Sequence, residues 1–203
     1  MTRLMRVLLV SALAAAIAAS ASATASAVTI NPAGPFVLTS NVLQTFNLPS
    51  LPATFTCLWT LQGRLLTTQI PLVEQLVQIG GIVGATIECN EPVVITALVS
   101  QLARLPGAWP IGLVPNTGVL NLPRPTGMLV TLLNVRVRVV TPTFSCLYTG
   151  SIGLLFKNGS NQVVLLGGSF RATPTIVDTC LPELVATKGP GTLTVEPEWV
   201  IGP

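Results

Sequence analysis

The chain of 203 residues has no histidine, and charged residues make up only 8% of it. An average soluble domain is about a quarter charged, so few side chains are available here for acid–base chemistry. Without an imidazole, the chain cannot form a Ser-His or Cys-His nucleophile pair, a histidine general base or a His-bearing metal site. The formal net charge is only +3, and no cluster of Lys and Arg is present. We therefore expect no nucleic-acid partner, because binding a phosphate backbone needs a basic stripe.

The first residues have the pattern of an export signal. Two arginines precede an apolar run over 7–19, and small residues follow through Ala27. This pattern predicts a signal peptide over 1–27, cleaved after Ala27, with Ala23 and Ala25 as alternative cleavage positions. The run is shorter than the roughly 20 residues of a spanning helix, and no longer apolar run follows. We expect a secreted or wall-associated protein without a membrane span.

A short motif occurs twice in the chain. Residues 55–60 (FTCLWT) and 144–149 (FSCLYT) are identical at four of six positions. A second cysteine follows the cysteine of each copy, after 32 residues in the first and 34 in the second. The aligned second cysteine indicates an internal duplication rather than a chance match of one hexapeptide.

The duplication also predicts how the cysteines pair. Four cysteines allow three pairings, and an oxidising compartment favours disulfides over free thiols. If the halves are copies, each half carries its own bond, which gives Cys57–Cys89 and Cys146–Cys180. These spacings are not the paired C-x₂₋₄-C spacings of a structural zinc site. We expect two disulfides and no metal.

Strand patterns dominate the second half. Val135, Val137 and Val139 alternate with Arg136 and Arg138, which predicts a strand with the valines buried and the arginines in solvent.

Other segments of the second half also predict strands. Asn158-Gly159 between two apolar runs predicts a two-residue hairpin turn with positive φ at both positions. This turn is favoured over a glycosylation acceptor at 158–160. Residues 192–195 and 199–201 are predicted to be closing strands.

The predicted fold is all-β. A Pro- and Gly-rich connection over 106–126 separates an N-terminal β half, 28–105, from a C-terminal β half, 127–203. Each half is small for a hydrophobic core of its own and would benefit from a disulfide. One continuous core and two small sandwiches in tandem both fit, and the apolar content of 50% favours one core. The sequence predicts a disulfide-stapled β-sandwich built from two similar halves. Segments 70–79 and 92–104 stay open between strand and helix, since apolar residues in 92–104 also fit helical spacing, so one or two short helices are allowed for.

A resemblance supports this fold class. The C-x-Y-x-G motif at 146–150, the later Cys180 and a terminal strand near 199–200 resemble a group of secreted, disulfide-bonded β proteins of high-GC Gram-positive bacteria. The similarity covers roughly residues 109–203. It implies an extracellular β-sandwich and supplies no catalytic residues.

Catalytic patterns are weak throughout the chain. Glu196 and Glu198 are separated by a proline, and Glu88 and Glu91 flank a cysteine, so neither pair predicts the facing carboxylates of a glycosidase. The nucleophile motifs G-x-S-x-G and S-x-x-K are absent, and no glycine-rich phosphate loop is present. We expect a protein that is not an enzyme and has no cofactor.

Binding residues are the remaining candidates. Trp109, between glycine and proline residues, is a candidate partner contact, although a core position is the more common place for such a residue. Arg136 and Arg138 suit an anionic wall polymer or simply a solvated strand. The leading hypothesis is a secreted structural or interaction module that binds an envelope or extracellular component. The alternatives are a carrier of apolar small molecules or lipids, favoured by the high apolar content, and a histidine-independent hydrolase.

Overall fold

The computed structural model describes residues 27–41, 43–48, 53–67, 69–71, 76–90, 92–99, 109–113, 126–173, 180–186 and 192–202. The all-β prediction is confirmed, because every regular element in these ranges is a strand. The fourteen strands are β1 (Ala27–Asn31), β2 (Gly34–Ser40), β3 (Gln44–Leu48), β4 (Ala53–Leu65), β5 (Gln69–Pro71), β6 (Val77–Cys89), β7 (Val94–Ala97), β8 (Trp109–Leu113), β9 (Gly127–Val140), β10 (Ser145–Lys157), β11 (Gln162–Ala172), β12 (Glu183–Ala186), β13 (Thr192–Glu196) and β14 (Val200–Gly202).

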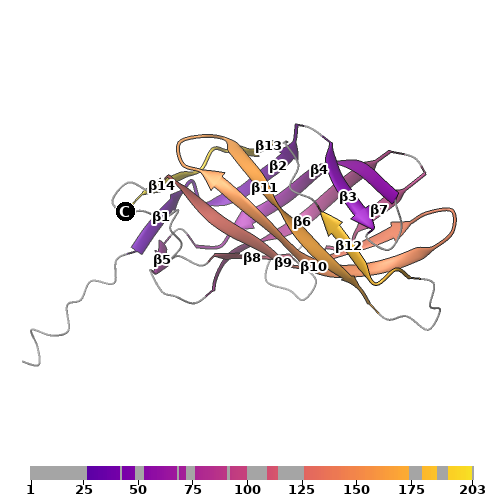
Figure 1. Ribbon diagram of the computed structural model, residues 1–203. Coiled ribbons are helices and arrows are strands. Elements are labelled where there is room, and N and C mark those ends of the chain that lie inside the picture. The colour runs from indigo at the N-terminus through magenta and orange to yellow at the C-terminus, as the bar shows by residue number, and fades with distance from the viewer. Residues whose placement is uncertain are drawn as a thin grey trace, which may run out of the picture.

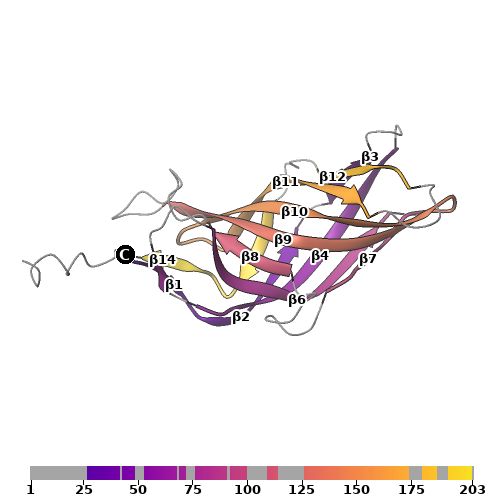
Figure 2. The same ribbon diagram turned by 90° about the horizontal axis from the view of Figure 1, so that it is seen from below.

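The main sheet closes on itself. Its strands follow the order β10-β9-β8-β6-β4-β2-β13-β11, and β11 pairs again with β10. This ring of eight strands is a barrel with extra strands, so the sandwich prediction is wrong in this respect (Figures 1 and 2). The physical reason lies in the long strands β4, β6, β9 and β10, of 13 or 14 residues each. Long strands twist and coil, and closure gives every strand of the ring a partner on both flanks.

The ring consists of two half-barrels with the same strand order. The N-terminal half-barrel is β2-β4-β6-β8, and the C-terminal half-barrel is β9-β10-β11-β13. Each half-barrel has three neighbouring antiparallel strands, β2-β4-β6 in the first and β9-β10-β11 in the second. A fourth, short strand, β8 or β13, lies at the edge of each half-barrel. The two copies of the repeated motif, on β4 and β10, lie four strands apart and thus on opposite sides of the ring. This arrangement supports the duplication that the sequence predicts, and the halves meet at two seams, β8–β9 and β13–β2.

Short strands extend the two ends of the barrel. At the right-hand end in Figure 1, β3 pairs with the start of β4, β12 lies between β3 and β11, and β7 pairs with β9. At the left-hand end, β1 pairs with β14 and β5 in a separate three-stranded sheet. The segment 106–126, predicted to be a connection, contains β8, which is a wall strand of the barrel. The rest of that segment, apart from Thr126, lies outside the described residues.

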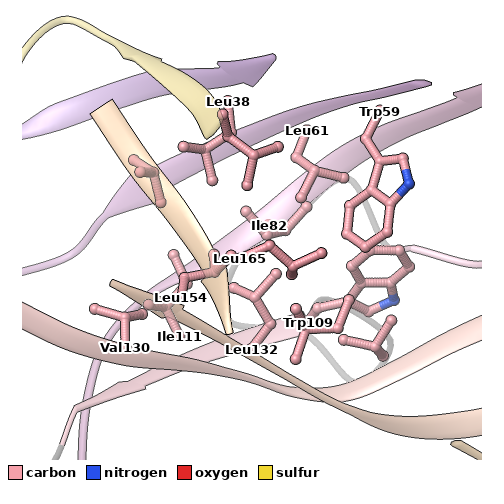
Figure 3. Close-up of a cluster of buried hydrophobic side chains, with 14 of the residues drawn as sticks. Leu38, Trp59, Leu61, Ile82, Trp109, Ile111, Val130, Leu132, Leu154 and Leu165 are labelled. Carbon is pink, nitrogen blue, oxygen red and sulfur yellow. The ribbon is translucent and has the colours of Figure 1, made fainter. Parts of the chain in front are cut away.

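Alternation along the strands builds one core inside the ring. Val135, Val137 and Val139 are buried while Arg136 and Arg138 are exposed, as predicted. Buried residues of both halves belong to one hydrophobic cluster. Figure 3 shows side chains from opposite walls meeting in it, with Leu38 and Leu61 facing Val130 and Leu154.

The helices allowed for in the first half are absent from the described residues. Within 92–104, residues 94–97 form β7, because Ile95 pairs with Val139 of β9 and points into the core. Within 70–79, the described residues belong to β5 and β6 or directly precede β6. Pairing with a neighbouring strand therefore overrides the helical spacing of the apolar residues.

The β10–β11 hairpin forms where it was predicted, but with a different turn. Four residues, 158–161, separate the strands, and only Gly159 has a positive φ, of 65°. Asn158 uses its side chain instead: its Nδ2 donates to the Ile201 carbonyl oxygen at 2.8 Å, and its Oδ1 accepts from the Ile201 N–H at 2.7 Å. This residue therefore ties β14 to the barrel. The closing strands β13 and β14 were correctly predicted.

Both predicted disulfides are present. Cys57 and Cys89 are register partners on β4 and β6, and their Cα atoms are 4.0 Å apart. Cys146 on β10 is bonded to Cys180, which lies just before β12, with a Cα–Cα distance of 5.6 Å. Two such bonds indicate folding in an oxidising environment. Each one crosslinks the end of the three-stranded unit of its own half-barrel.

Candidate binding surface

The barrel interior is filled rather than hollow. Toward the end that carries β3 and β7, the described residues leave a cavity of about 10 Å³, lined only by apolar and aromatic residues: Phe46, Trp59, Ile87, Ile95, Trp109, Val135, Val137, Ile152 and Phe170. Ligand pockets usually measure about 300–1,000 Å³. This cavity therefore has room for about one water molecule and none for a lipid or cofactor.

Trp109, the predicted partner contact, belongs to this interior. Only 1% of it is exposed, and its Nε1 donates to the Leu98 carbonyl oxygen at 3.1 Å. Figure 3 shows it close to Trp59 of β4, two strands away in the same half-barrel. The side chain therefore supports the core and presents no ring to a partner.

Two buried polar atoms lie at equivalent places of the repeat. Trp59 Nε1 and Tyr148 Oη have no hydrogen-bond partner, although both side chains are almost fully buried. Burial raises the pKa of Tyr148 above its ordinary value of 10.0, because desolvation disfavours the phenolate. The Tyr148 phenol therefore keeps its proton at neutral pH.

The described carboxylates are dispersed. Glu88 lies on β6, Glu183 on β12, Glu196 at the end of β13 and Glu198 between β13 and β14. In the described part of the chain, no three His, Cys, Asp or Glu side chains come together as a metal site would require. Glu91, the partner of Glu88 in the sequence prediction, lies outside the described residues.

Arginines gather on one outer surface of the C-terminal half-barrel. Thr149 of β10 pairs with Arg136 of β9 on one side and with Arg171 of β11 on the other, so these three side chains form a row across the sheet. Arg138 lies two residues along β9 from Arg136 and on the same face. All three arginines are exposed. We call these three arginines and Thr149 the arginine face.

Hydroxyl groups surround the arginine face. Thr149 Oγ1 lies 3.3 Å from Thr173 Oγ1, Thr96 of β7 pairs with Arg138, and Ser151 pairs with Ser169 in the next row. These groups can donate and accept hydrogen bonds.

One acid borders the face. Glu183 of β12 lies beside Arg171 in the register. Within the described residues, no carboxylate forms an ion pair with the three arginines. The three side chains are exposed to solvent, so their guanidinium groups lie at the surface.

The first half carries no such charge at the equivalent place. There the row consists of Thr39, Thr60 and Thr86, from β2, β4 and β6. Threonine thus satisfies the structural needs of an outward position in this row. The arginines of the second half are not required by the fold.

Arg136 and Arg138 were predicted from the sequence as candidate contacts, whereas Arg171 was not. The alternation on β9 identified the first two as outward residues, whereas Arg171 lies 35 positions after Arg136 on another strand. Only the strand register brings it into the same row. No local sequence pattern reports such a cross-strand neighbour.

The comparisons with known proteins add no family. No protein-family model, curated protein or solved structure matches the chain. Among the described residues, no helix has the length and apolar character needed to cross a membrane. The function is therefore inferred from the surface and interior described above.

Proposed function

We propose that the chain is a secreted, non-catalytic interaction module that binds a component of the cell envelope or extracellular space. The observation that carries this proposal is the closed and filled barrel, whose interior cavity of about 10 Å³ leaves binding to the outer surface. The two disulfides and the predicted signal peptide over 1–27, of which residues 1–26 lie outside the described residues, support export. The resemblance to secreted β proteins of high-GC Gram-positive bacteria points to the same location.

The two alternative functions have less support. A carrier of apolar molecules needs an interior of a few hundred Å³, and the cavity in the barrel is far smaller. A hydrolase needs a positioned nucleophile or a pair of facing carboxylates, and the described acids lie on separate elements. Neither observation points to a ligand or substrate held inside the protein.

A fractionation experiment tests the proposal. The full-length protein is expressed in a high-GC Gram-positive host, and mass spectrometry of the supernatant and wall extract should find a mature chain that begins at Val28. The mature protein should sediment with isolated envelope material and release no product from esterase, glycosidase or peptidase substrates. Lipid that co-purifies in native mass spectrometry would favour the carrier function. An intact Met1 in the membrane fraction would contradict export.

A further inference from the structure

We propose that the arginine face binds an anionic polysaccharide, through ion-paired hydrogen bonds from Arg136, Arg138 and Arg171 to carboxylate or phosphate groups on the polymer. This inference rests on the proposed function, which it extends by naming the partner class and the surface. It concerns the outside of the barrel and does not involve the buried cavity.

The first argument is the concentration of positive charge. The described residues include five basic side chains, Arg64, Arg136, Arg138, Lys157 and Arg171. Three of these five share the arginine face, and the only acid in their rows is Glu183 at its border. In a chain so poor in charge, three arginines on one surface produce a local positive potential that attracts anions.

The second argument is the geometry of the arginines. Arg136 and Arg171 are two strands apart, which places their backbones about 10 Å from each other, and Arg138 lies about 7 Å further along β9. One extended polymer can therefore contact more than one guanidinium at once. Arginine donates a fork of two N–H groups, which matches the two oxygens of a carboxylate or phosphate. Thr149, Ser151 and Ser169 supply hydroxyl partners for a sugar.

The third argument comes from the duplication. Thr39, Thr60 and Thr86 occupy the same row in the N-terminal half-barrel, so the fold itself does not require charge there. The threonine row of the first half is thus an uncharged counterpart of the arginine row within the same molecule. The charged row is an addition to the common framework.

Other polyanions fit the face less well. Single-stranded nucleic acid binds largely by stacking its bases on aromatic rings. Of the ten aromatic side chains, nine are buried and Phe144 is half-buried. An anionic membrane surface is typically recognised by about four to eight clustered Lys and Arg, more than this face has. Binding a polysaccharide needs neither exposed aromatic rings nor a larger basic cluster. Anionic polysaccharides also occur in the cell envelope and extracellular space, where an exported protein would encounter them.

Binding is measured with the mature, disulfide-bonded protein and two anionic probes. One is polygalacturonate, with its methyl-esterified form as an uncharged match, and the other is a polysaccharide whose sugar units are joined by phosphodiester bonds. Calorimetry at low and physiological salt should show binding to at least one anionic probe that weakens as salt rises, and none to the esterified polymer. Changing the three arginines to Ala together should weaken binding about tenfold or more. Arg64→Ala, an exposed arginine elsewhere on the barrel, should change it less than about twofold.

The outcomes separate the two proposals. Changing the three arginines to Lys keeps the charge but removes the forks, so binding should fall between wild type and the Ala variant. Unchanged melting temperatures show that the variants fold. Binding to neither probe, binding that survives the triple Ala change, or equal binding to single-stranded DNA would overturn the inference. If the protein sediments with envelope material in those cases, the proposed function still stands. If it does not sediment and binds neither probe, both fail.

Discussion

At the scale of single residues, the repeat places Trp59 and Tyr148 in matching positions with different chemistry. Both fill the barrel with a large ring, and both bury a polar atom without a partner. Burial of the aromatic ring is the stabilising contribution of each residue. The buried N–H or O–H without a partner lowers stability, because it loses its hydrogen bonds to water and gains none in the protein. Trp109 differs, since its indole N–H reaches a carbonyl oxygen.

Tyr148→Phe should leave stability unchanged or raise it by up to about 1 kcal/mol, because the ring stays and the unpaired hydroxyl is removed. Urea denaturation measures this.

As Tyr148 is the only tyrosine, absorbance of the tyrosinate reports its titration alone. Its raised folded pKa means that the folded state keeps the proton when the unfolded state loses it, so wild-type stability falls above about pH 10. The Phe variant should lack that part of the loss. A clear destabilisation of the variant at neutral pH would show that the hydroxyl has a partner.

Asn158 is the opposite case, because its polar side chain stabilises the fold through hydrogen bonds. Asn158→Ala removes both hydrogen bonds to the Ile201 backbone and should lower the free energy of unfolding by about 1–3 kcal/mol. Tryptophan fluorescence should also change, because Trp199, which directly precedes β14, stacks on Phe156 with ring centroids 4.3 Å apart. Asn161→Ala, at an exposed site in the same loop, is the control and should have little effect. Equal effects of the two changes would contradict the tethering role.

At the scale of elements, each half-barrel contains a unit of three antiparallel strands with a disulfide near one end. The sequence separations are similar, 32 and 34 residues. The bonds differ in setting, because Cys57 and Cys89 join paired strands whereas Cys180 lies before β12. Loop length dominates the chain-entropy contribution, so the two bonds should contribute similarly despite this difference.

Removing either disulfide as a pair, Cys57→Ser with Cys89→Ser or Cys146→Ser with Cys180→Ser, should lower the free energy of unfolding by about 3–4 kcal/mol. Thermal and urea unfolding measure the loss. Peptide mapping without reduction should recover the two native pairs in wild type. A loss below about 1 kcal/mol for either double variant would contradict the chain-entropy account for that disulfide. It would show that the unfolded chain already has little conformational freedom in that loop without the bond.

The success of sequence reasoning differed between local and long-range features. The valine–arginine alternation lies within one segment, and the disulfide pairs follow from two matching motifs in the sequence; both predictions are confirmed. The strand at Ile95 was ambiguous because its pairing with Val139 is 44 residues distant. The arginine face was half predicted, since Arg171 joins it only through the register.

At the scale of the whole molecule, closure determines where binding can occur. A sandwich and a barrel can share the same strands and differ only in whether the outermost strands meet. The sequence predicted two similar halves but held no information on their two seams, β8–β9 and β13–β2. With both seams paired, the described strands enclose a core whose cavity measures about 10 Å³, and this is why we propose that recognition occurs on the outer faces.

Amide hydrogen exchange at the seams, measured residue by residue with NMR, tests this closure most directly. The strands β8 and β13 each have a partner on both flanks, so consecutive amides should be protected in Ile111–Leu113 and in Leu193–Val195. The edge strand β14 is the internal control, where amides facing away from β1 should exchange quickly unless a side chain binds them, as Asn158 does at Ile201. Uniform slow exchange at β8 and β13 is the predicted result. Alternating slow and fast amides in either strand would show an open edge and contradict the closed barrel.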